Sequence, residues 1–359
     1  MLLLKRTGLV LLGLLLILTI IVGILLLDKP STPPIVNQSG EALENSIAQI
    51  EFIDIGGIPQ WLLIRSHNID NPPLLVVHGG PGSPEAELFR AFNSELEKHF
   101  TVVHWHQRGA GWTRTGNETV NDYKIDTHLE DVDEIVRHIY ERFGEQKVFI
   151  LGHSWGSVLG IRHIRNHPDL VAAYIGVGQV TDLTESEQRG CDYIQAQAES
   201  AGDAQVLAEV ASFCHPPFTP EYAMTQRPYL SRYKGDMQEL TLPLLGWQMF
   251  STEEATLMSV INLARGSIEG VENMWDELMA INFFEEPTTF DVPIFFVLGR
   301  TDYQVSATLA ADYFGRISAP CKQLQWFENS GHFPMWEEPE DFNEFMITEV
   351  LNLKGCQSN

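Results

Sequence analysis

The chain has 359 residues, of which 44% are hydrophobic and 20% are charged. This is enough apolar material for one large domain with a buried core, or for two modest domains, and it excludes a wholly disordered chain. Asp and Glu outnumber Lys and Arg by 48 to 23, which leaves a formal net charge of −25 at pH 7. Because an acidic surface repels polyphosphates, the composition argues against nucleic acid as a partner.

Residues 1–30 are predicted to be a membrane anchor. Residues 7–27 carry no charged side chain, and as a helix this stretch would rise about 30 Å, the thickness of a bilayer's hydrocarbon core. Lys5 and Arg6 precede it, so the positive-inside rule places the N-terminus in the cytoplasm and the rest of the chain outside. A cleaved signal peptide is the alternative, but its apolar region is normally shorter and ends at small residues. We therefore expect a single-pass protein of the cell membrane.

A proline-rich segment is predicted to separate the anchor from the remainder of the chain. Pro30, Pro33 and Pro34 cannot continue a helix, because proline lacks the amide hydrogen and its ring clashes with the preceding turn. Residues 31–50 are therefore expected to form an extended spacer.

Beyond the spacer, strand-type and helix-type patterns alternate over residues 51–179 and again over 291–359. Runs such as PLLVV, KVFIL and VPIFFVLG are nearly continuous apolar stretches, as in strands that are covered on both faces. Between these runs, apolar residues recur at the three- and four-residue steps of an amphipathic helix. The alternation predicts an α/β fold with a mostly parallel sheet and helices on both faces.

Residues 180–290 break this alternation. They contain helix-forming runs interrupted by prolines and lack convincing strands. We therefore expect a helical cap that is inserted between two parts of the core.

The sharpest motif is GHSWG at residues 152–156, which follows an apolar strand and precedes a helical pattern. In this setting GxSxG is typical of a nucleophile elbow, in which the flanking glycines allow a tight turn that exposes the serine hydroxyl. Ser154 is therefore the predicted nucleophile. His153, inside the elbow, is expected to pack beneath the turn rather than to transfer protons.

A serine hydroxyl becomes a strong nucleophile only when a base removes its proton, so a histidine oriented by a carboxylate is required. In this architecture the chain order is Ser, then Asp or Glu, then His. His332 follows the last strand-type run, whereas His215 lies within the predicted cap. Asp302 follows the end of an apolar strand, where catalytic groups gather in open sheets, whereas Asp291 precedes that strand. His332 is the predicted base, and Asp302 is the carboxylate predicted to orient it.

Acyl transfer also places negative charge on the carbonyl oxygen of the substrate, and fixed backbone N–H groups are needed to receive it. A strand ends at HGGPG, residues 78–82, where the absence of side chains lets the amides turn toward a substrate. Gly80 is the preferred first donor and Gly79 is the alternative. The second donor is expected to be Trp155, the residue after the nucleophile.

The four cysteines have no CxxC spacing and no histidines at zinc-finger distances, so a structural metal site is not expected. They are Cys191, Cys214, Cys321 and Cys356. The spacing leaves open which of them pair, or whether all four are free thiols.

Together these motifs resemble the α/β-hydrolase superfamily and, more narrowly, the proline iminopeptidases, which are serine aminopeptidases that remove an N-terminal proline. The motifs follow that family's order: HGGPG at 78–82, QRGAG at 107–111, GHSWGS at 152–157, GRTD at 299–302 and GH at 331–332. The resemblance covers the chain from about Glu51 to Asn352. It implies the α/β-hydrolase fold with a helical cap between the sixth and seventh strands.

The chain departs from the family's pattern in two places. His106 stands before QRG, where the iminopeptidases commonly have Asp. Carboxylates of the cap hold the substrate's ammonium group in that family, and the candidates here lie outside any recognisable family motif. These candidates are Glu185, Glu187, Glu253 and Glu254.

The sequence thus predicts a membrane-anchored serine hydrolase whose substrate is a short peptide or amide with a free N-terminus, with proline as the expected first residue. A carboxylesterase or lactonase that acts on a small ester is the alternative enzyme. A binding protein that keeps this scaffold without catalysis is the non-enzymatic alternative, because a fold does not dictate a function. No cofactor or metal ion is expected, and the oligomeric state stays open.

Overall fold

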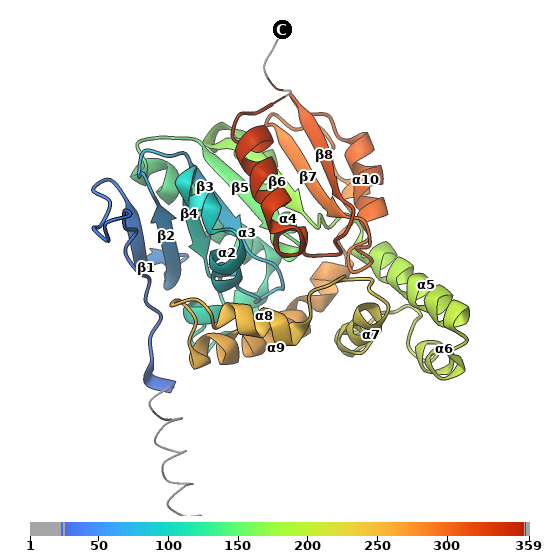
Figure 1. The fold of residues 1–359 in the computed structure, drawn as a ribbon. Coiled ribbons are helices and arrows are strands. Elements are labelled where there is room, and N and C mark those ends of the chain that lie inside the picture. The colour runs from blue at the N-terminus through green and yellow to red at the C-terminus, as the bar shows by residue number, and fades with distance from the viewer. Residues whose placement is uncertain (1–22, 24–25, 355, 357–359) are drawn as a thin grey trace, which may run out of the picture.

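The computed structural model describes residues 23, 26–354 and 356. Its centre is an eight-stranded sheet with the strand order β1-β2-β4-β3-β5-β6-β7-β8 (Figure 1). The strands are β1 Ile47–Ile55, β2 Ile58–Ser66, β3 Pro73–Val77, β4 Thr101–Trp105, β5 Val148–His153, β6 Val171–Val177, β7 Ile294–Gly299 and β8 Lys322–Phe327.

The sheet is antiparallel only at one edge. β1 pairs with β2 and β2 with β4 in antiparallel fashion, whereas all the other neighbouring strands are parallel. Gly56 and Gly57 connect β1 to β2 with φ angles of 57° and 74°, and a two-residue loop of this hand needs positive φ at both positions. The mostly parallel sheet confirms the predicted fold class.

Side chains from the two faces of the sheet enter two separate apolar cores. Leu75 and Val77 of β3 belong to one core, whereas Leu74 and Val76 belong to the other, because successive side chains of a strand point to opposite faces. The helices that cover the first face are α3 (Ile125–Arg142), α4 (Trp155–Asn166) and α10 (Ala307–Arg316). Those that cover the second face are α2 (Ala86–Phe92), α11 (Pro334–Glu337) and α12 (Pro339–Phe345).

The chain between β6 and β7 forms helices that gather along one end of the sheet (Figure 1). They are α5 (Leu183–Ala201), α6 (Ala204–Val210), α7 (Pro220–Arg232), α8 (Leu242–Met249) and α9 (Leu257–Met279). Several of these helices share an apolar cluster of their own, which includes Ile194, Val210, Leu230 and Trp275. The division of the chain into a core and a cap over residues 180–290 stays a prediction.

The segment after the predicted anchor packs against the core. Ile35 is only 5% exposed, and the Arg65 guanidinium donates a hydrogen bond of 2.7 Å to the Pro33 carbonyl. β1 begins at Ile47, inside the segment that was expected to be a spacer. The segment lies against the core because the buried Arg65 guanidinium needs hydrogen-bond acceptors, and the Pro33 carbonyl supplies one.

The expected location at the cell membrane is corrected. None of the helices within the described ranges is long and apolar enough to cross a bilayer. The expectation rested on the apolar run of residues 7–27, which lies outside the described residues except for Gly23, Leu26 and Leu27. The single-pass topology with an extracytoplasmic catalytic domain is therefore withdrawn.

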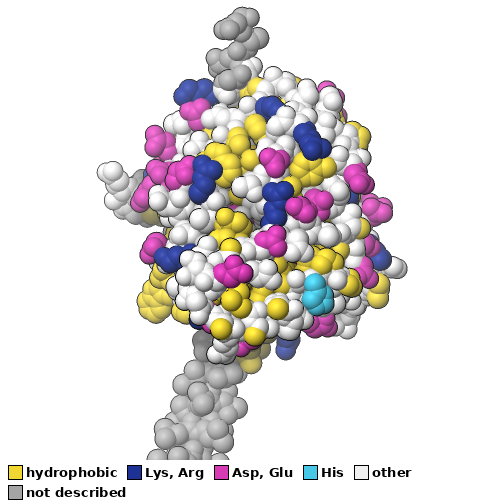
Figure 2. Space-filling view, turned by 90° about the vertical axis from the view of Figure 1, so that its right-hand side faces the viewer, with side chains coloured by type: hydrophobic (Ala, Val, Ile, Leu, Met, Phe, Trp, Pro, Cys, Tyr) yellow, Lys and Arg dark blue, Asp and Glu magenta, His cyan; other side chains and the backbone are white. Residues whose placement is uncertain are grey.

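The cysteines pair in two disulfides, Cys191 with Cys214 and Cys321 with Cys356, with Cα atoms 5.6 Å and 5.0 Å apart. The first bridge joins α5 to the segment after α6, and the second joins Cys321, the residue before β8, to the chain after α12. On the face shown in Figure 2, acidic side chains are interspersed with basic and apolar ones. The negative charge is therefore mixed with other side-chain types on that face.

Candidate active site

A cavity of about 480 Å³ lies between the loops of the sheet and the helices that follow β6. Four of the five predicted site residues line it: Gly80, Ser154, Trp155 and His332. The fifth, Asp302, is 2% exposed and contacts His332. Three side chains from distant parts of the sequence therefore come together beside one cavity, because β5, β7 and β8 are parallel and end at the same edge.

Ser154 occupies a sharp turn between β5 and α4. Its φ of 51° and ψ of −119° lie in a region that residues with side chains rarely adopt. The turn is held so tightly that a Cβ atom on Gly156 would overlap the Val77 carbonyl oxygen. A Cβ atom on Gly152 would lie 2.6 Å from the Gly156 carbonyl oxygen. These contacts explain why both flanking positions of the GxSxG motif are glycine, since any side chain there would clash with the backbone.

Asp302 and His332 form a buried hydrogen bond of 2.8 Å between the carboxylate and Nδ1 of the ring. The amides of Gln304 and Val305 donate to the other carboxylate oxygen at 2.9 and 3.1 Å. Burial alone would raise the pKa of Asp302, but the charge of His332 and these hydrogen bonds outweigh it and lower the pKa. Nε2 of His332 has no hydrogen-bond partner within the described part of the chain. This nitrogen is therefore free to exchange a proton.

The HGGPG loop is held in place by two residues of the named motifs, Gln107 and His78, to which the sequence analysis assigned no role. The Gln107 side chain donates to the His78 carbonyl and accepts from the indole of Trp155, both at 2.9 Å. Burial lowers the pKa of His78 to about 4, so the neutral ring donates from Nδ1 to Gly79 and accepts from the Gln107 amide. Gln107 lies in the QRGAG motif, which was the only available signal.

Gly80, the predicted oxyanion donor, has a φ of 118°. A Cβ atom there would lie 2.6 Å from the Gly82 nitrogen, so only glycine fits this turn. Trp155, the other predicted donor, is the first residue of α4. Helix N-termini present unpaired N–H groups, which suits the binding of negative charge.

His106 fills the place where the resemblance led us to expect Asp. Its ring stacks on Trp61 at 3.9 Å and accepts a hydrogen bond of 3.1 Å from the Trp112 amide. Burial holds the pKa of His106 well below its usual range, so the ring is neutral. The substitution is therefore accommodated by packing beside the QRGAG turn.

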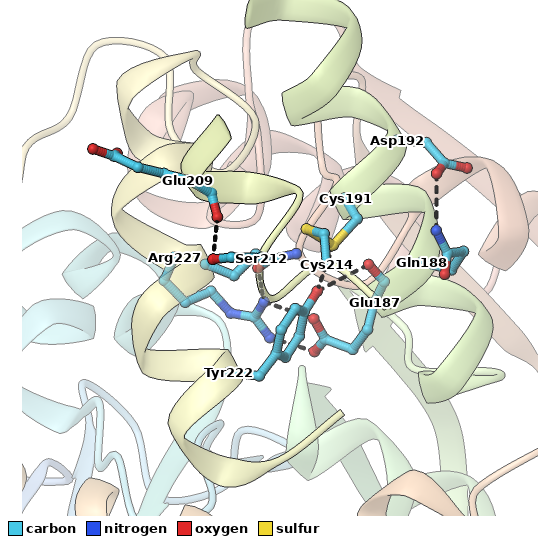
Figure 3. The surroundings of a disulfide bond; sticks show 10 residues. Glu187, Gln188, Cys191, Asp192, Glu209, Ser212, Cys214, Tyr222 and Arg227 are labelled. Carbon is cyan, nitrogen blue, oxygen red and sulfur yellow. Dashed lines mark hydrogen bonds and ion pairs between the residues drawn. A yellow bond between two sulfur atoms is a disulfide. The ribbon is translucent and has the colours of Figure 1, made fainter. Parts of the chain in front are cut away.

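Of the four cap carboxylates considered, only Glu187 lines the cavity. Figure 3 shows it beside Arg227 and Tyr222, near the Cys191–Cys214 disulfide. Both carboxylate oxygens of Glu187 are already bound by Arg227, at 2.6 and 2.9 Å. This carboxylate is thus neutralised within the protein.

The other three cap carboxylates do not line the cavity. Glu185 and Glu253 are exposed, and Glu254 is buried and binds Arg90 at 3.0 Å. The described residues contain no group of three or more His, Cys, Asp or Glu placed to hold a metal ion.

Comparison with known proteins places this geometry in a family. A family model of the alpha/beta hydrolase fold matches residues 72–204. A probable aminopeptidase of Bacillus subtilis, YbaC, is 30% identical over 309 residues, which are 83% of this chain and 95% of that protein. The chain belongs to the α/β-hydrolase family.

More distant relatives agree with this assignment. A proline iminopeptidase of Saccharolobus solfataricus is 24% identical over 293 residues, which cover 79% of this chain and 85% of that protein. The crystal structure of a proline iminopeptidase from Mycobacterium smegmatis has a TM-score of 0.63 at 16% identity, covering 85% of this chain and 98% of that one. An esterase from Exiguobacterium antarcticum has a TM-score of 0.57 at 18% identity, covering 84% and 99%. This α/β hydrolase is therefore similar to proline iminopeptidases, and the solved structures share its fold.

Proposed function

We propose that this α/β hydrolase is a serine aminopeptidase that releases the N-terminal residue of short peptides, with proline as a preferred first residue. The observation that carries the proposal is the buried hydrogen bond between Asp302 and His332, and His332 lines the same cavity as the strained Ser154 turn. A serine, an imidazole and a carboxylate in this chain order are the parts of an acyl-transfer triad.

In the proposed reaction, the Ser154 oxygen forms a bond to the acyl carbon while its proton passes to Nε2 of His332. Asp302 keeps Nδ1 of the imidazolium hydrogen-bonded, and the amides of Gly80 and Trp155 receive the oxyanion. His332 then protonates the leaving amine as the carbon–nitrogen bond breaks. A water molecule attacks the acyl-enzyme by the same sequence in reverse, which releases the amino acid and restores Ser154.

The substrate class rests on the relatives and on the cavity wall. YbaC is named a probable aminopeptidase, and the Saccharolobus protein is named a proline iminopeptidase. Most of the side chains that line the cavity are apolar, including Leu183, Leu263, Trp275 and Leu278 from the helices after β6. We propose that residues 180–290 act as a cap that surrounds the first residue of the substrate with these side chains.

A specific observation favours a small-ester hydrolase as the second candidate. Glu187 and Glu85, the two carboxylates that line the cavity, are bound by Arg227 and His153 respectively. An ammonium group would have to compete with these partners, whereas a neutral ester would not. The same triad would hydrolyse either bond.

Two experiments test the proposal. A fluorophosphonate probe should label the wild-type protein stoichiometrically and should not label Ser154→Ala. Absence of labelling in folded wild-type protein would favour the binding-protein alternative. Hydrolysis of proline naphthylamide should then exceed that of N-acetyl-proline naphthylamide and of acetate and butyrate esters. Activity confined to the esters would refute the aminopeptidase assignment and keep the serine mechanism.

A further inference from the structure

A second imidazole–carboxylate pair lies directly behind the proposed triad. Nδ1 of His153 is 2.6 Å from a carboxylate oxygen of Glu85, and Nε2 is 3.1 Å from the backbone carbonyl oxygen of His332. Both side chains of the pair are buried, at 2% and 6% exposure. The His153 ring also lies 4.9 Å from the His332 ring, centre to centre.

The partners of His153 determine how many protons the pair must hold. A carbonyl oxygen only accepts hydrogen bonds, so Nε2 must carry a hydrogen. Nδ1 faces the Glu85 carboxylate, and a lone pair on that nitrogen would repel it. A neutral imidazole has only one N–H group, so satisfying both contacts requires a second proton between Nδ1 and Glu85.

The same pair joins three separate segments of the site. His153 immediately precedes Ser154 in the elbow, and its Nε2 holds the backbone of His332. The Glu85 oxygen that faces His153 also accepts from the Gly79 amide at 3.1 Å, in the loop that carries Gly80. The side chains of Glu85 and His153 therefore connect the Ser154 elbow, the loop that carries His332 and the HGGPG loop, called here the oxyanion loop.

We propose that Glu85 and His153 are a positioning pair: a proton on Nε2 of His153 and a second proton between Nδ1 and Glu85 hold Ser154, His332 and the oxyanion loop in the relative positions that catalysis requires. This inference rests on the proposed serine mechanism. When the second proton is lost, the lone pair of Nδ1 faces the Glu85 carboxylate and repels it. The contacts that hold the three segments together are then weakened, so catalysis falls at alkaline pH.

The groups around His153 support retention of that proton. Besides Glu85, the titratable groups that face it are His332, Asp302 and His78, and the rings of Phe333 and Trp336 complete its surroundings. Burial alone would lower the pKa of His153, but the charge and hydrogen bond of Glu85 outweigh it and raise the pKa. Neutral His78 adds no opposing charge.

The central test is Glu85→Gln, because an amide cannot serve both contacts. If its oxygen faces Gly79 and His153, Nε2 is left without a hydrogen toward His332. If its NH₂ group faces His153, the Gly79 amide loses its acceptor. The rate of fluorophosphonate labelling should therefore fall, and its alkaline decline should disappear or begin at least about one pH unit lower than in wild type.

His153→Phe and Asp133→Asn complete the set. Phenylalanine keeps the packing against Phe333 and Trp336 but removes both protons, so labelling at neutral pH should fall by up to about 100-fold without the wild-type alkaline decline. Asp133 binds a ring nitrogen of His163 at 2.6 Å outside the cavity. It thus offers the same chemistry without the proposed role, and Asp133→Asn should keep the wild-type pH profile.

A second readout does not depend on activity. NMR of ¹⁵N-histidine-labelled protein at pH 8 should show one ring with hydrogens on both nitrogens, and that signal should be lost in His153→Phe and changed in Glu85→Gln. A singly protonated His153 at pH 8, or an unchanged alkaline midpoint in folded Glu85→Gln, would overturn the inference. Wild-type protein that fails to label would instead refute the serine mechanism, and the NMR result would still decide the proton count.

Discussion

Glu87 offers a quantitative test of how this fold treats a buried carboxylate. It lies in the first turn of α2, is 2% exposed, and has its pKa raised from 4.5 to about 7, chiefly by burial and also by the charge of Glu254. The folded state therefore binds more protons than the unfolded state between these two values. Consequently the free energy of unfolding should decrease as the pH rises through this window, and the full cost should be present above pH 7.

The magnitude follows from the shift. At about 1.4 kcal/mol per pKa unit, a rise of this size costs about 3 kcal/mol at pH 8 but only about 1 kcal/mol at pH 5. Glu87→Gln removes the charge and keeps the shape, so its gain in the free energy of unfolding should be about 2 kcal/mol larger at pH 8 than at pH 5.

The assay is urea unfolding of wild type and Glu87→Gln at both pH values. Glu95→Gln is the matched control, because Glu95 is half-exposed and pairs with Lys98 at the surface, where ion pairs contribute about 0–1 kcal/mol. An equal gain for Glu87→Gln at pH 5 and pH 8 would refute the reasoning, since it would mean that the side chain does not stay charged and buried above pH 7.

Three further outcomes are expected. Asp302→Asn should lower kcat by about 10⁴-fold in folded protein, because His332 loses the partner that holds its tautomer; a loss below tenfold would count against the triad. Replacing Cys191 and Cys214 by serine should lower the free energy of unfolding in urea by about 3 kcal/mol, since the bridge spans 23 residues; an unchanged value would contradict that role. Gly82→Ala should destabilise the protein by at least about 1 kcal/mol and slow fluorophosphonate labelling, because φ is +81° and the new Cβ would overlap the Gly266 carbonyl. Unchanged thermal unfolding and labelling would show that α9 shifts to make room for the new Cβ.

Local patterns were sufficient to predict the central sheet. Runs such as PLLVV of β3 and IFFVLG of β7 are buried along their whole length, and the sequence shows this directly as continuous apolar stretches. The GxSxG turn could also be predicted from the sequence. Its two glycines are required by close contacts with residues of the elbow itself and with the adjacent end of β3.

The anchor expectation had no such support. Hydrophobicity over residues 7–27 measures only the capacity to span a bilayer, and no helix among the described residues has that property. The spacer stays a prediction, and proline content, which predicts an extended backbone, carries no information about the contact between Pro33 and Arg65.

By itself, the sequence determined the order of strands and helices and the candidates Ser154, Asp302 and His332, because periodicity and turn chemistry act between near neighbours in the chain. Only the tertiary structure decided which distant groups meet: Cys191 with Cys214, Glu187 with Arg227, and Glu85 with His153. These choices depend on how parallel strands stack and how helices close over their ends. The sequence leaves many pairings of buried polar groups open, and folding selects pairings that satisfy most buried donors and acceptors at once.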